Sequence, residues 1–233
     1  ILDVWTGQDL ACAQPRPDTR LLFDEASGAT TFADDSGFGN EGTCSGSTCP
    51  ASGVGGKDGN AVTFDGSNDY VQVMMDLSDT QYGATLWFKT TCQSCGLFQL
   101  ANDAPTNANH NKDRNLYLNK GNVCARVYSD ETICTTGLNV ADGNWHFLAH
   151  TLGGSVGGQK LYVDGVLKVS GSKSVSDFDW HDRVIVGYSY KATTKYLAGT
   201  IDEVTVYSRA LTEGEVRDRY RSALVVYALD EAA

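Results

Sequence analysis

The sequence is poor in proline and has no long apolar segment. Four prolines occur in 233 residues, and no stretch approaches the roughly 18 consecutive apolar residues that a membrane-spanning helix needs. We therefore expect no insertion into a membrane. The apolar share of 41 % is larger than disordered chains contain. A folded chain is predicted, and a single all-β domain of about 200–250 residues is common.

Basic residues are also scarce, and they do not cluster along the chain. Lys and Arg total 18 against 29 Asp and Glu, so the net charge is −11. A surface with this charge repels the phosphate backbone of nucleic acids, and no local run of basic residues offsets it. The sequence therefore predicts no nucleic-acid partner. The many carboxylates suit calcium binding, but the solubility of the chain accounts for them equally well.

Patterns that indicate catalysis are scarce as well. Gly153–Gly157 matches G-x-S-x-G, but it joins two predicted strands, whereas a nucleophile elbow joins a strand to a helix. Asp202 and Glu203 are adjacent, so on a strand they point to opposite faces and form no catalytic pair. The four histidines lack the spacing of metal ligands. We predict no enzymatic activity, with glycoside hydrolysis kept as a third alternative.

Seven cysteines are present, and six of them form short-range pairs. The pairs are Cys44 with Cys49, Cys92 with Cys95, and Cys124 with Cys134. We predict a disulfide in each pair and an oxidising location, either secreted or on the cell surface. The Cys92–Cys95 ring is the shortest, and so short a ring strains disulfide geometry. Zinc binding by these two thiols is the alternative, but a second pair of ligands is missing.

The first 19 residues differ from the rest of the chain. Residues 1–19 show weak periodicity and contain Pro15 and Pro17, so we predict a lead-in or linker. Cys12 lies in this segment and is expected to be unpaired within the domain, or to bond to another chain. The chain begins with Ile1 and shows no signal peptide, which indicates a mature product or a piece of a longer protein.

From Arg20 onward, short runs rich in β-forming residues alternate with turn residues. Such runs, without a long 3.6-residue period, predict an all-β, two-sheet antiparallel sandwich of the jelly-roll type. Asp164-Gly165 is the strongest hairpin signal, because a type I′ turn requires positive φ at both positions. The predicted strands are Leu21–Asp24, Ala61–Asp65, Tyr70–Val73, Ala84–Lys89, Leu97–Leu100, Asn115–Leu118, Val123–Tyr128, Trp145–Leu152, Lys160–Val163, Val166–Val169, Val184–Gly187 and Ile201–Tyr207.

One short C-terminal helix is predicted. Thr212 is a suitable N-cap, and Glu215 is placed to reach back to it in a capping box. The helix is expected over about Glu213–Arg221 and should close a domain of residues 20–221.

The segment that follows the helix is predicted to be a strand. Residues 222–233 contain an apolar, β-branched run, and Leu229–Ala233 repeats the pattern of Phe23–Ser27. We interpret the segment as the start of a following repeat, or as a strand that pairs with another subunit, because an unpaired strand edge recruits other chains.

Seven segments occur in a characteristic order between residues 20 and 221. They are Asp34–Gly42, Asn60–Val71, Ala84–Lys89, Asp142–Phe147, Leu161–Gly165, Gly199–Val204 and Tyr207–Thr212. In this order they resemble the laminin-G-like group of the concanavalin A-like jelly rolls, in particular the bacterial laminin-G-like domain. The resemblance implies two antiparallel sheets, one of them concave, with loops at the rim. Five aromatic residues are expected between the sheets: Phe64, Tyr70, Trp87, Trp145 and Tyr162.

The resemblance also implies a structural Ca²⁺ between an N-terminal loop and the last long strand. Asp34, Asn40 and carbonyl groups of Gly37–Gly42 are the expected ligands on one side, and Asp202 on the other. Calcium takes about six to eight oxygens at ~2.3–2.6 Å. The alternative is that Asp34 and Asn40 only close an Asx-turn. The acidic stretch 177–182 is either a second calcium site or a solvated loop.

Aromatic and polar residues outside the core pattern are candidates for ligand binding. They are His110, Asp113, Trp180, Tyr188 and Tyr190. Because sugar sites combine an aromatic face with a few carboxylates or amides, we predict a non-catalytic binding or adhesion domain whose partner is a glycan or an extracellular protein. The alternative is a structural repeat of an extracellular assembly that contacts neighbouring copies of itself.

Overall fold

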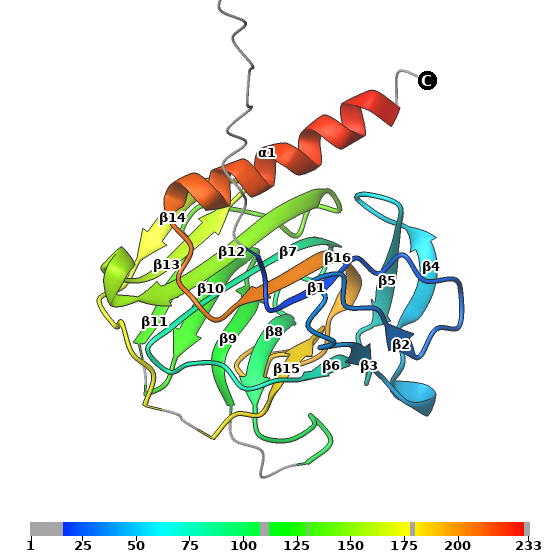
Figure 1. Cartoon of the computed structure of the whole chain (residues 1–233), viewed down its shortest axis with the longest axis horizontal. Coiled ribbons are helices and arrows are strands. Elements are labelled where there is room, and N and C mark those ends of the chain that lie inside the picture. Colours follow the sequence, from blue (N-terminus) through cyan, green and yellow to red (C-terminus); the bar gives the residue numbers. More distant parts are fainter. Residues whose placement is uncertain (1–15, 108–111, 130, 178–179, 231–233) are drawn as a thin grey trace, which may run out of the picture.

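Two antiparallel sheets of eight strands each pack face to face in the computed structural model, which describes residues 16–107, 112–129, 131–177 and 180–230 (Figure 1). Sheet A runs in the order β14 (Val166–Ser170), β13 (Gly158–Val163), β12 (Trp145–Gly153), β7 (Gln81–Thr90), β16 (Ala198–Tyr207), β5 (Asn60–Asp65) and β4 (Ala51–Gly55), with β1 (Thr19–Leu21) paired to β16. Sheet B runs in the order β11 (Glu131–Cys134), β10 (Asn122–Val127), β9 (Lys112–Asn119), β8 (Gly96–Ala101), β15 (Arg183–Val186), β6 (Val71–Met74), β3 (Gly42–Thr43) and β2 (Thr31–Phe32). The predicted sandwich of two antiparallel sheets is confirmed.

Each of the strands predicted between Leu21 and Tyr207 overlaps an observed one, and the hairpin turn is as expected. Asp164 has a φ of 52° and Gly165 a φ of 72°, as a type I′ turn requires. The strands that the sequence did not predict are β2, β3, β4 and β11. The strands β2 and β3 contain two residues each, and β4 contains two glycines. These three strands therefore lack the alternation of apolar and polar residues on which the prediction depends.

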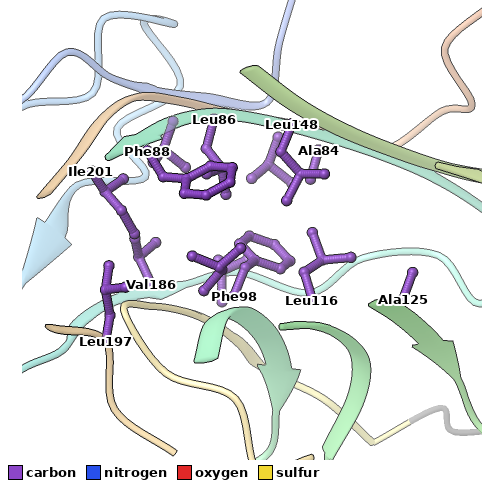
Figure 2. Close-up of a cluster of buried hydrophobic side chains, with 14 of the residues drawn as sticks. Ala84, Leu86, Phe88, Phe98, Leu116, Ala125, Leu148, Val186, Leu197 and Ile201 are labelled. Carbon is purple, nitrogen blue, oxygen red and sulfur yellow. The ribbon is translucent and has the colours of Figure 1, made fainter. Parts of the chain in front are cut away.

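The space between the sheets is filled by aliphatic and phenylalanine side chains (Figure 2). Leu86 and Phe88 point from β7 toward Phe98 of β8, and all three are completely buried. Trp87, between Leu86 and Phe88, belongs to a different cluster, because successive side chains of a strand point to opposite faces.

The outer face of sheet A is covered by helix α1 (Glu213–Asp230), as Figure 1 shows. Trp87 and Phe147 form an apolar cluster with Val216 of the helix. Tyr220 stacks on Trp87, with the ring centroids 5.7 Å apart. The helix is therefore packed onto the sheet by aromatic contacts.

Of the five aromatic residues predicted between the sheets, Phe64 lies there. Trp87, Trp145 and Tyr162 lie instead in the cluster beneath α1, and Tyr70 lies in a small cluster on the outer face of sheet B. The prediction was wrong for these four because alternation separates two faces of a strand without showing which face meets the other sheet. Here the outer face of each sheet also carries an apolar cluster.

The capping box of α1 is confirmed, but the helix is longer than predicted. The Thr212 N–H donates to Glu215 Oε2 at 2.8 Å, and the Glu215 N–H donates to Thr212 Oγ1 at 3.3 Å. The backbone stays helical to Asp230, where we predicted a strand. Neither Gly nor Pro interrupts residues 215–230, so nothing in this stretch ends the helix early. Within the described residues, no helix is long and apolar enough to cross a membrane.

Two of the three predicted disulfides are present, Cys44–Cys49 and Cys124–Cys134. Cys92 and Cys95 are free thiols, so the third prediction was wrong. The Cys95 thiol points to the backbone of Cys92 and lies 3.6 Å from its carbonyl oxygen. Burial raises the pKa of the Cys95 thiol, which disfavours the reactive thiolate. Cys12 lies outside the described residues.

Candidate ligand-binding site

A hollow of about 180 Å³ opens on the outer face of sheet B. Its inner wall includes Arg126 of β10. Ala125 and Val127, on either side of it, belong to the core between the sheets, so the Arg126 side chain points outward. We call this site the sheet B hollow, and its lining residues are Lys112, Arg126, Tyr128, Asp177, Trp180, Tyr190 and Lys191.

Three aromatic side chains of the sheet B hollow are open to solvent. Trp180 is 67 % exposed, Tyr128 is 39 % exposed and Tyr190 is 37 % exposed. Large apolar side chains scattered singly over a surface need no explanation, whereas a group of them around a concavity is typical of a binding site. Each ring combines an apolar face with a polar group, which suits a ligand that is itself amphipathic.

Basic side chains lie against these rings. Lys112 Nζ is 3.3 Å from the centroid of the Tyr190 ring, and Lys195 Nζ is 4.6 Å from it. The Arg126 guanidinium carbon is 5.4 Å from the centroid of the Tyr128 ring. Burial lowers the pKa of Lys112, and the neighbouring cations Lys195, Lys191 and Arg126 lower it further. The described side chains of the hollow are therefore predominantly basic.

Buried side chains fix the backbone of two of the aromatic residues. The Tyr190 N–H donates to Gln99 Oε1 at 2.9 Å, and Asn115 Nδ2 donates to the same oxygen at 2.9 Å. The Tyr128 N–H donates to Asp113 Oδ1 at 2.7 Å. Gln99, Asn115 and Asp113 are all completely buried. These contacts hold both aromatic residues in position before any ligand arrives.

Asp177 holds the neighbouring loop against the end of β10. Its Oδ2 atom accepts hydrogen bonds from Lys173 Nζ at 2.9 Å and from Ser129 Oγ at 3.2 Å. The Asp177 N–H donates to the Tyr128 carbonyl oxygen at 3.1 Å. The carboxylate of Asp177 thus has structural partners as well as a place in the lining of the hollow.

The structure brings together two of the five predicted ligand-binding residues, Trp180 and Tyr190. Tyr188 is buried and packs on Tyr196 with the ring centroids 4.8 Å apart, so it offers no surface to a ligand. Asp113 is buried behind the hollow, where its Oδ2 atom also accepts from Ser176 Oγ at 2.6 Å. His110 lies outside the described residues.

The basic side chains of the hollow were missed by the sequence prediction. We inferred that no basic cluster offsets the negative charge, but Lys112, Arg126, Lys191 and Lys195 meet here. They come from β9, from β10 and from the turn after β15, so they form no run along the chain. One signal in the sequence could have indicated part of this basic group. Lys191 and Lys195 lie in the turn that begins with Tyr190, which was itself predicted to bind the ligand.

The predicted calcium ligands fall into two separate hydrogen-bond groups. Asp34 Oδ1 accepts from the backbone N–H groups of Arg20 and Ser36, both at 2.9 Å. Asp34 Oδ2 accepts from Ser36 Oγ at 2.7 Å and from the Asn40 N–H at 2.9 Å. These four donors occupy the lone pairs of the Asp34 carboxylate. This is the arrangement of the Asx-turn alternative.

Asp202 has different partners. Its Oδ2 atom accepts from the backbone N–H groups of Lys57 at 2.7 Å and of Asp58 at 3.1 Å. Among the residues that the structure describes, no three His, Cys, Asp or Glu side chains gather as a metal site. The resemblance predicts a shared Ca²⁺, whereas in this arrangement the hydrogen-bond donors already occupy the carboxylates of Asp34 and Asp202 and argue against it.

Chelation tests this calcium prediction directly. Because Asp34 and Asp202 are satisfied by N–H and O–H donors, we expect the same melting temperature in EDTA and in millimolar CaCl₂. An ion bound to the native state alone would add about 2.7 kcal/mol at a hundredfold excess over its Kd. A melting temperature that rises with calcium in the unmodified protein, and not in Asp202→Asn, would establish the shared site.

Comparison with known proteins places this architecture in a family. A sequence profile described as the concanavalin A-like lectin/glucanases superfamily matches residues 65–217. The chain belongs to this superfamily. The jelly-roll fold is thereby confirmed, and the matched residues include β7 to β16, which carry the sheet B hollow. No curated protein matches the sequence.

Solved structures with the same fold come from toxins and from a glycosidase. The binding domain of paraclostridial mosquitocidal protein 1 has a TM-score of 0.63 and 17 % identity, over 88 % of this chain and 52 % of that one. Domain 4 of AbnA, an extracellular arabinanase of Geobacillus stearothermophilus, was solved with arabinotriose. It has a TM-score of 0.61 and 23 % identity, over 87 % and 97 % of the two chains.

A third example is the ligand-binding domain of botulinum neurotoxin serotype D, solved with N-acetylneuraminic acid. Its TM-score is 0.61 and its identity 16 %, over 89 % of this chain and 51 % of that one. The present chain thus spans about half the length of the two toxin domains. At these identities the likeness concerns the fold alone.

Proposed function

We propose that this chain is a non-catalytic carbohydrate-binding domain of a secreted or cell-surface protein, and that it binds sugar in the sheet B hollow. The observation that carries the proposal is the group of exposed aromatic rings, Trp180, Tyr128 and Tyr190, around one concave site. A sugar ring has an apolar face that stacks on an aromatic ring, and hydroxyl groups that bond to polar side chains at the rim.

Two similar structures support this assignment. One was solved with arabinotriose and another with N-acetylneuraminic acid, so other proteins of this fold bind sugars. The two disulfides support an extracellular location, because such bonds persist in oxidising compartments. An extracellular protein and neighbouring copies of this chain remain predicted partners.

Glycoside hydrolysis finds no support in the adjacent acidic pair. Asp202 is tied to the backbone of Lys57 and Asp58, and Glu203 forms an ion pair with Arg20 at 3.2 Å. Burial raises the pKa of Asp202 to about 7, and it also raises the pKa of Glu203. Desolvation of a structural carboxylate accounts for both shifts without a catalytic role.

Replacing Trp180 by alanine tests the site. We expect the affinity for a sugar found on a glycan array to fall by at least about tenfold, which is about 1.4 kcal/mol, because the largest exposed ring of the hollow is lost. Titration calorimetry with the purified sugar measures the change.

The matched control is Phe38→Ala, which removes another exposed aromatic ring at a site away from the hollow. Phe38 is 56 % exposed and its ring lies 4.3 Å from the guanidinium carbon of Arg16. Phe38→Ala should bind as the unmodified protein does. Unchanged binding by Trp180→Ala would place the sugar site elsewhere on the domain.

A further inference from the structure

We propose that the sheet B hollow selects sugars that carry a negative charge, through a carboxylate or a sulfate group held by Lys112, Arg126 and Lys191. The inference extends the proposed function, since it names the class of sugar that the same site takes. It follows from the juxtaposition of basic side chains and aromatic rings in one hollow.

The described lining of the hollow contains more basic than acidic residues, whereas the whole chain is acidic. The net charge of the protein is −11. Among the described residues that line the hollow, three are basic (Lys112, Arg126 and Lys191) and one is acidic (Asp177). Lys195 adds a fourth cation beside the Tyr190 ring. On an acidic surface, a concave site with this excess of basic groups concentrates anions rather than cations.

The positively charged side chains of the hollow are close enough to repel one another electrostatically. The pKa of Lys112 is lowered first by burial and then by Lys195, Lys191 and Arg126. An anion placed among these groups adds attraction to the repulsion between the cations and favours the charged form of Lys112. Folding brings these like charges together, and an anionic ligand would add attraction to the arrangement.

Arg126 is suited to hold the charged group of such a ligand. It is 6 % exposed and lies within strand β10, so little side-chain freedom is lost when it binds. A guanidinium group donates two parallel hydrogen bonds to a carboxylate or a sulfate. Lys112 and Lys191 carry point charges that tolerate either geometry.

The aromatic rings place the sugar beside this charge. Tyr190 is fixed by its N–H bond to Gln99, and Lys112 Nζ lies 3.3 Å from the centroid of its ring. A sugar ring stacked on Tyr190 or Trp180 would therefore hold a ring substituent within reach of a cation. A neutral sugar can stack in the same way, but it brings no negative charge to the basic groups, so it should bind more weakly.

The test compares charged and neutral sugars of similar size by titration calorimetry. The probes are oligogalacturonate and sialyllactose for the carboxylate, lactose sulfate for the sulfate, and lactose and arabinotriose as neutral controls. We expect at least one anionic probe to bind at least tenfold more tightly than the neutral sugars. Its affinity should fall when NaCl is raised from 50 to 300 mM, because salt screens charge pairs. The preferred anionic probe identifies the charged group.

The variant Lys112→Gln/Lys191→Gln should remove the preference for the charged probe, with at least a tenfold loss of affinity for that probe and a smaller loss for neutral sugars. Lys168→Gln is the matched control, because Lys168 is exposed on β14 of the other sheet, and it should bind as the unmodified protein does. Lys191→Gln alone changes an exposed side chain and should give a smaller loss in the same direction. Circular dichroism and melting curves confirm that each variant is folded.

The outcomes separate the two proposals. If neutral sugars bind as tightly as charged ones, and Trp180→Ala abolishes both, the hollow is a sugar site without charge selection, and this inference is wrong. It is also wrong if the double lysine variant keeps its affinity for the anionic probe. If none of the probes and no glycan on an array binds, the proposed function fails and this inference fails with it.

Discussion

Replacing Phe98 by alanine is expected to lower the free energy of unfolding by about 3–5 kcal/mol. Phe98 is completely buried in β8, at the centre of the core between the sheets (Figure 2). It lies opposite Leu116 of β9 and Val186 of β15 in the sheet register. Truncation removes the apolar ring and leaves a cavity that the surrounding strands cannot collapse into, since both neighbours are held by backbone hydrogen bonds.

Urea unfolding followed by tryptophan fluorescence measures this loss, with the slope of the transition checked for constancy. Phe38→Ala is again the control, because an exposed phenylalanine contributes within about 0.5 kcal/mol. A loss below 1 kcal/mol in Phe98→Ala would contradict the assignment of this ring to the centre of the core. The residues that line the hollow include none of β8, so the folded Phe98→Ala variant should keep its sugar affinity.

The strands could be predicted from the sequence because their signals are local. Alternation of apolar residues and the Asp164-Gly165 turn are read within a few positions. The assignment of side chains to layers could not be predicted in the same way. Trp87 alternates correctly with Leu86 and Phe88, yet the face that it occupies is covered by α1, more than a hundred residues later in the chain.

The candidate site was predicted in part, for a related reason. Trp180 and Tyr190 stood out as aromatic residues outside the strand pattern. Lys112 and Arg126 did not, because each lies on its own strand, and it is the pairing of β9 with β10 that places them together. A charge cluster assembled from separate strands has no counterpart in the order of residues, so it becomes visible with the fold.

Between about pH 6.5 and about pH 4, one buried histidine is expected to make a contribution that destabilises the protein as the pH falls. His150 is completely buried. The pKa of this imidazole is lowered to about 4, and burial is the largest cause of the shift. Its Nδ1 atom is 2.7 Å from the Tyr82 hydroxyl group, and its Nε2 atom is 3.1 Å from Gln159 Oε1. The amide oxygen of Gln159 can only accept, so Nε2 carries the proton and Nδ1 accepts from Tyr82.

The sign of the effect follows from which state binds the proton. Below pH 6.5 the histidine of the unfolded chain is protonated, whereas His150 of the native state stays neutral down to about pH 4. The unfolded state therefore binds more protons in this range, and stability falls as the pH falls. The full effect is about 3 kcal/mol, at about 1.4 kcal/mol per pKa unit.

Asp202 acts in the opposite direction over nearly the same range. Burial raises its pKa from 3.8 to about 7. The native state holds this proton while the unfolded state has released it, so Asp202 makes the protein less stable as the pH rises toward 7. The pH dependence of the unmodified protein is thus a difference between two opposing contributions, and it does not isolate His150.

The variant His150→Gln isolates it, because Asp202 contributes equally to both proteins. A glutamine at this position keeps one donor and one acceptor for Gln159 and Tyr82 but has no proton to bind. Urea unfolding at intervals between pH 7 and pH 4 should show the unmodified protein losing about 3 kcal/mol relative to His150→Gln. Two parallel curves would mean that His150 has the same protonation in the folded and unfolded protein, and that water reaches the hydrogen bonds between Tyr82, His150 and Gln159.

These hydrogen bonds continue to the edge of sheet B, because Gln159 Nε2 donates to Glu131 Oε2 at 2.7 Å. The same measurement therefore reports how firmly the interior of the domain is closed beside the strands that carry the hollow.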